Sequence, residues 1–89
     1  MGKIKSIKIL GQNININWVD TIGNTEYLGL ARPDDFTVDV KKNVQPDVET
    51  LTLIHELLHI VEAITGIKLK EHEINLLSYA VRDISMQVK

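Results

Sequence analysis

The spacing of the apolar residues changes at Pro46, and this change constrains the fold more than any other feature of the sequence. Before Pro46, apolar and polar residues alternate in short runs, most clearly over residues 13–18, as in a strand with one buried face. After Pro46, apolar residues recur every three or four positions, as in an amphipathic helix. The chain is therefore expected to be α+β, with the strands first and the helices after them.

Four short strands are predicted in the first half. They cover residues 7–9, 13–18, 26–31 and 36–40, with turn signals at Gly11-Gln12, at Gly23-Asn24 and in the segment 32–35. Glycine, asparagine, proline and aspartate favour tight turns, and short connections favour hairpins. The expected sheet is therefore short and mostly antiparallel.

Two helices are predicted in the second half. The first runs from Pro46 to residue 65, because proline suits the first helical turn and Gly66 can end the helix in a left-handed conformation. The second runs from about Lys70 to about Met86. Residues expected to face inward are Leu51, Ile54, Leu57, Leu58, Val61 and Ile64 in the first helix, and Ile74, Leu77, Ala80, Val81 and Ile84 in the second.

Length and composition limit the possible functions. A chain of 89 residues is expected to form a single domain over residues 1–89. Its 10 basic and 12 acidic residues give a net charge of -2, which argues against nucleic-acid binding. No apolar stretch is long enough to span a membrane, and residues 1–5 lack the apolar core of a signal peptide, so we expect a cytoplasmic protein that does not bind membranes. The expected oligomeric state is a monomer or a weak dimer.

The sequence HELLH at positions 55–59 lies inside the first predicted helix. His55 and His59 are four residues apart, so both imidazoles project from one helix face and can bind one metal ion at about 2.0–2.1 Å. Glu56 lies about a third of a turn away, where by analogy with zincins it would act as the general base. Because the chain has no cysteine, any zinc must be held by histidine and carboxylate.

A catalytic zinc ion usually has three protein ligands, so a third is required. Glu73 is the preferred candidate, because it lies one residue from the predicted inward stripe at Ile74 and could point toward the histidines. Glu71 and His72 are alternatives. Glu62 is a further rival, but is expected to accept a hydrogen bond from an imidazole N–H.

The segment 51–62, followed by Gly66 and by the sequence EHEINLLSYA at 71–80, resembles small gluzincin-type zinc metallopeptidases of bacteria and their phages. The resemblance is to minigluzincins and to ImmA/IrrE-like zincin domains, and it covers the C-terminal half closely. In that family a Glu-Ala-Asn element on the second helix supplies the third ligand, and Glu73-Ile74-Asn75 is similar to it. The resemblance thus implies a zincin-like fold in which the sheet precedes an active-site helix and a second, glutamate-bearing helix.

These features predict a metallopeptidase that hydrolyses peptide bonds through a zinc-bound water. The expected cofactor is Zn²⁺, with His55, His59 and Glu73 as its ligands. The expected catalytic residues are Glu56, as general base, and Tyr79, which could polarise the carbonyl or stabilise the oxyanion.

The resemblance also implies that a peptide or protein substrate lies along an edge strand of the sheet, and Tyr27 to Ala31 is the predicted strand. Gly29 would permit close backbone approach there, or would mark a strand bulge. An alternative function is a non-catalytic, zinc-stabilised partner-binding module of phage or prophage origin. A metal-free interaction domain is a third possibility.

Overall fold

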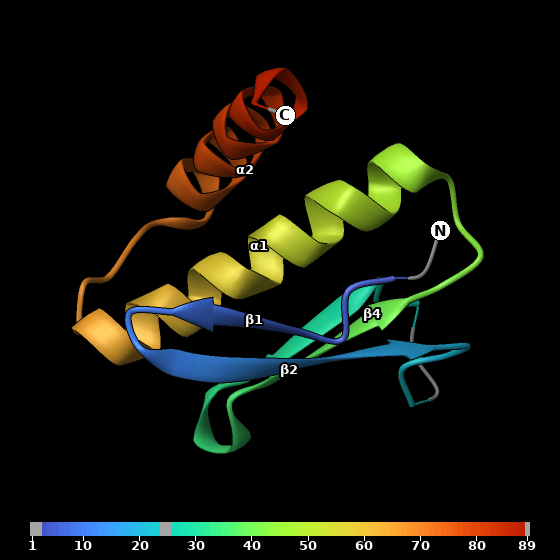
Figure 1. Ribbon diagram of the computed structural model, residues 1–89, viewed down its shortest axis with the longest axis horizontal. Helices are drawn as coiled ribbons and strands as arrows, with labels where there is room; N and C mark the ends of the chain where they lie inside the picture. Colours follow the sequence, from blue (N-terminus) through green and yellow to red (C-terminus); the bar gives the residue numbers. More distant parts are fainter. Residues whose placement is uncertain (1–2, 24–25, 89) are drawn as a thin grey trace.

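The computed structural model describes residues 3–23 and 26–88. Its elements are β1 (Ser6–Ile9), β2 (Gln12–Val19), β3 (Gly29–Arg32), the 3₁₀ helix η1 (Pro33–Asp35), β4 (Thr37–Lys41), α1 (Pro46–Thr65) and α2 (Glu71–Gln87). One face of the four-stranded sheet is covered by α1, and α2 packs against α1 (Figure 1). The α+β class and the order of strands before helices are confirmed.

The sheet is mixed, with the strand order β1-β2-β4-β3. The β1–β2 and β3–β4 pairs are antiparallel, as expected, but β2 and β4 are parallel. After β2 the chain forms the edge strand β3, and β4 then lies between β2 and β3 in the sheet. The central strand β4 places Val38 and Val40, both fully buried, on the face that α1 covers, whereas Leu30 of β3 pairs with Asp39 on the opposite face and is 39% exposed.

The connections follow the predicted turn signals with small shifts. β3 begins at Gly29, three residues later than predicted, and η1 occupies the predicted break after Arg32. The predicted turn at Gly23-Asn24 includes Asn24, which lies outside the described residues. Between β1 and β2 the two-residue loop is Leu10-Gly11, with φ of 50° and 83°, so Gln12 already belongs to β2.

The core lies between the sheet and α1. Its buried residues are Ile14, Ile16, Val38, Val40 and Ile60. From α1, Leu53, Leu57 and Ile64 pack against this cluster. Since α1 also contacts α2, it is sandwiched between two neighbours, which explains why residues 51–59 are all partly buried.

Helix α2 is less deeply packed than its sequence predicts. Ile74 and Ser78 are buried and Val81 is partly buried, whereas Leu77, Ala80 and Ile84 are exposed, so these three were wrongly expected to face inward. The reason is that α2 packs on the outer side of α1 and buries only a narrow stripe. Ser78 tolerates burial because its hydroxyl donates a hydrogen bond of 2.8 Å to the Ile74 carbonyl oxygen.

Candidate metal centre and adjoining cleft

His55 and His59 lie side by side on α1. Their ring centroids are 5.0 Å apart, and the ring planes meet at 65°. The side chains are 23% and 32% exposed, so both imidazoles are accessible yet partly shielded from solvent. The helical spacing thus places both rings on one face, as expected.

A carboxylate from the first turn of α2 completes a cluster with the two histidines. The Oε1 atom of Glu71 lies 3.1 Å from Nε2 of His55. The potential ligand atoms of His55, His59 and Glu71 all lie within 4.8 Å of one another. These three residues form a group that could hold a metal ion.

The structure brings Glu71, and not Glu73, to the histidines. The Glu73 carboxylate instead accepts a hydrogen bond of 2.7 Å from the Lys70 backbone N–H at the start of α2. The spacing along the helix explains the difference: Glu71 precedes the buried Ile74 by three residues and shares its face, whereas the adjacent Glu73 is turned by about 100°. This i, i+3 relation is the signal that could have identified Glu71 from the sequence.

Glu62 orients His59. One carboxylate oxygen lies 2.8 Å from Nδ1 of His59, and the other accepts a hydrogen bond of 2.7 Å from the Leu69 backbone N–H. The Leu69 bond first, and the His59 bond second, lower the pKa of Glu62. Since an ionised carboxylate only accepts, Nδ1 of His59 carries the proton and Nε2 keeps a free lone pair for a metal. Glu62 has the contact expected for it.

Glu56 points to the other side of α1, toward the sheet edge. A Cβ atom at Gly29 of β3 would lie 3.2 Å from the Oε2 atom of Glu56. Burial raises the pKa of Glu56, an effect that the neighbouring His55 and His59 and, least of all, the backbone N–H of Ala31 oppose. A carboxyl group with a raised pKa is a stronger proton acceptor, which suits a general base.

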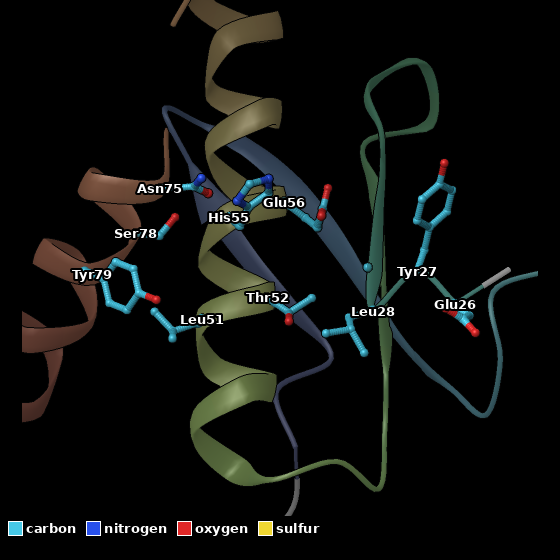
Figure 2. Close-up of a pocket in the computed structure, with 11 residues that line it drawn as sticks. Glu26, Tyr27, Leu28, Leu51, Thr52, His55, Glu56, Asn75, Ser78 and Tyr79 are labelled. Atoms are coloured by element: carbon cyan, nitrogen blue, oxygen red, sulfur yellow. The ribbon is translucent and has the colours of Figure 1, made fainter. Parts of the chain in front are cut away.

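A cleft of about 370 Å³ adjoins His55 and Glu56. Figure 2 shows Asn75, Ser78 and Tyr79 of α2 on one side of His55, and the segment 26–28 on the other. Tyr79 is 51% exposed, and its ring centroid lies 5.1 Å from the guanidinium carbon of Arg82. Both residues that were predicted to be catalytic, Glu56 and Tyr79, thus line this cleft.

Two further cleft residues, Thr52 and Ser78, were not anticipated from the sequence. Thr52 lies three residues before His55, and Ser78 lies three residues after Asn75. The i, i+3 rule places each of these pairs on one helix face, so this spacing is the signal that could have found them.

The strand beside this cleft, β3, is an edge strand, as predicted for this part of the chain. It packs against α1 at Gly29. A Cβ atom at this position would lie 2.6 Å from Cγ2 of Thr52 and 2.8 Å from Cγ of Glu56. Gly29 therefore makes room for side chains of α1, whereas the predicted close approach of a peptide backbone stays a prediction.

No helix among the described residues combines the length and apolarity needed to cross a membrane. Comparisons with family models, curated proteins and solved structures gave no match. What is known of the site is thus its donor set, its geometry and its surroundings.

Proposed function

We propose that this protein is a zinc-dependent peptide hydrolase of the gluzincin type. The observation that carries the proposal is the group formed by His55, His59 and Glu71, whose ligand atoms lie within 4.8 Å of one another. This group borders the partly buried Glu56 and the cleft. Glu71 takes the place in the ligand set that the sequence predicted for Glu73.

The donor chemistry favours zinc. Two imidazole nitrogens and one carboxylate oxygen form the His₂Glu set that holds catalytic zinc while leaving a coordination position open. The Glu62 contact with Nδ1 of His59 adds the outer-shell support that zinc-binding histidines usually have. A bound zinc ion would polarise the peptide carbonyl and lower the pKa of water.

Glu56 is the proposed general base. It would accept a proton as water adds to the carbonyl carbon, and would then deliver that proton to the amine nitrogen as the C–N bond breaks. Its position beside His55 in the cleft lining and its raised pKa support both transfers. Tyr79, in the opposite wall, is the proposed donor to the carbonyl oxygen.

The proposed substrate is an extended peptide lying along the edge of β3. An edge strand has unpaired main-chain groups, and peptides often bind by pairing with them. The cleft borders both this edge and His55, so a peptide held there would have its backbone near the proposed metal.

Metal analysis and one variant test the proposal. We expect the purified protein to bind about one zinc ion per chain and to cleave a fluorescent casein substrate. The Glu56→Gln variant is expected to keep the zinc and to lose about 10²- to 10⁴-fold in rate. Cleavage at the wild-type rate by Glu56→Gln, or an inability of the wild type to bind zinc, would reject the mechanism.

A non-catalytic, zinc-stabilised module is the second candidate function. One observation favours it: the ligand group joins two elements, since the histidines belong to α1 and Glu71 belongs to α2. A metal ion there would hold the helices together without any reaction. Stoichiometric zinc, a lower melting temperature after chelation and no hydrolysis of casein would together favour this role.

A further inference from the structure

Strand β3 passes close to α1 at Gly29, and space, not backbone conformation, requires the glycine there. Gly29 is not among the residues with positive φ, so other residues could adopt its backbone conformation. A Cβ atom, however, would lie well inside van der Waals contact with Cγ2 of Thr52 and Cγ of Glu56. Any larger residue would therefore move β3 or Glu56.

The hydrogen-bond register of β3 shows which of its main-chain groups face the open edge of the sheet. The Leu28 carbonyl oxygen accepts a bond of 2.8 Å from the Lys41 N–H, so the main-chain groups of residue 28 face the sheet. Main-chain direction alternates along an antiparallel edge strand, so residues 29 and 31 direct their main-chain groups away from β4. The Glu56 carboxylate lies at this open edge, because a Cβ atom at Gly29 would lie 3.2 Å from its Oε2 atom. The outward Ala31 N–H is also one of the groups that oppose the rise in the pKa of Glu56.

We propose that Gly29 is a positioning residue for Glu56. It leaves the room that lets β3 lie against α1 at this point, with the Glu56 carboxylate close to the outward Ala31 N–H and beside the cleft. A side chain at residue 29 would separate the two elements and move the carboxylate away from that N–H. The catalytic consequence rests on the proposed function, whereas the placement of Glu56 does not.

A double-mutant cycle read by NMR tests this placement in the metal-free, full-length protein. The signal is the backbone amide of Ala31, compared among wild type, Glu56→Ala, Gly29→Ala and the double variant. In the wild-type background, Glu56→Ala is expected to shift this amide resonance upfield and to speed its exchange with solvent. In the Gly29→Ala background, Glu56→Ala should change neither, because the carboxylate already lies away from the Ala31 N–H. Sequence-neighbour effects of residue 29 cancel in this comparison.

Two results would overturn the proposal: no response of the Ala31 amide to Glu56→Ala in the wild type, or an equal response in both backgrounds. If Gly29→Ala alone does not fold, folding and the free energy of unfolding are measured instead of the Ala31 amide signal. Glu56→Ala and Thr52→Ser remove the two atoms that the new methyl group meets, so adding both must restore folding. Failure to restore it would equally reject a role for Gly29 in making room for Glu56.

An activity measurement tests the catalytic consequence. If the protein cleaves casein, Gly29→Ala is expected to lower kcat by about 100-fold, as small misplacements of catalytic groups do, with zinc affinity unchanged. Adding Thr52→Ser should recover stability but not kcat, since the contact with Glu56 remains. Recovery of both would show that residue 29 only affects packing, and would count against the proposal. An inactive wild type would refute the proposed function, while the NMR cycle would still decide the placement.

Discussion

The first turn of α2 contains two glutamates with different contacts. Glu71 lies against His55, whereas Glu73 accepts a hydrogen bond from the Lys70 backbone N–H. Adjacent helix positions differ by about 100° in direction, so residues two apart cannot share a face. The identity of the third ligand is therefore decided by the face of α2 that packs on α1.

Paired variants test which glutamate is the ligand. Glu71→Gln is expected to weaken zinc binding by at least about tenfold, because even the loss of an outer-shell partner costs about 10- to 100-fold. Glu73→Gln should leave zinc affinity unchanged, since its amide oxygen can still accept the Lys70 N–H. Competition with a chromophoric chelator measures both constants. The reverse order of effects would restore Glu73 as the ligand, as its resemblance to the Glu-Ala-Asn element implies.

Side-chain identity and helical spacing were enough to predict that His55 and His59 share a face. The sequence prediction chose Glu73, although the spacing of Glu71 from Ile74 points to Glu71. The predicted inward stripe of α2 also included Leu77 and Ile84, which are exposed. Because Glu73 lies four residues before Leu77, that error placed Glu73 on the side that was expected to face the histidines.

At the scale of elements, the β1–β2 hairpin contains a residue that is poorly suited to its backbone conformation. Leu10 has a φ of 50° and is 68% exposed, and Gly11 follows it with a φ of 83°. Two positive φ angles in a two-residue loop are typical of a type I′ turn, for which Asn-Gly is preferred. A leucine gains little packing at this position and bears the steric cost of the left-handed region.

Leu10→Asn is accordingly expected to stabilise the protein. The left-handed conformation costs an L-residue about 1–2 kcal/mol, and asparagine tolerates it better, so we expect a gain of about 1 kcal/mol. In a domain of this size that corresponds to about 4–8 °C in melting temperature. Thermal and urea denaturation measure the change. Leu76→Asn, at an equally exposed leucine inside α2, is the matched control and should give no gain.

The elements themselves were predictable from periodicity and turn residues, whereas their pairing was not. Alternation located the strands because each has one face against α1, and Pro46 and Gly66 marked the ends of that helix. The parallel β2–β4 pair could not be read in the same way, because alternation says which face is buried but not which strand is the neighbour. The extent of burial of Val38 and Val40 depends on that neighbour.

At the scale of the whole molecule, the candidate metal centre joins two parts. The sheet and α1 share a buried core, whereas α2 packs on α1 through a narrow stripe. The hydrogen bond from the Leu69 N–H to Glu62 holds the loop between the helices against α1. A metal ion bound by His55, His59 and Glu71 would add a second link between α1 and α2.

Zinc is therefore expected to stabilise the whole protein. At a free concentration 100 times the dissociation constant, binding to the folded state alone adds about 2.7 kcal/mol. Melting curves followed by circular dichroism, with zinc and with a chelator, measure this gain. At the same zinc concentration, Glu71→Gln should gain less than the wild type. Identical melting temperatures with and without zinc in the wild type would contradict the predicted centre.

The position of Glu56 beside the edge strand β3 has a consequence for the behaviour of the protein in solution. Strands at the border of a sheet can pair with those of another molecule, and charged groups placed on them discourage such aggregation. Glu56 places a carboxylate beside this edge strand, since its Oε2 atom would lie 3.2 Å from a Cβ atom at Gly29. Replacing it with alanine removes the polar group, whereas glutamine keeps a polar side chain of the same length beside the strand. Glutamine is for this reason the better choice for an inactive form intended to remain dispersed at high concentration.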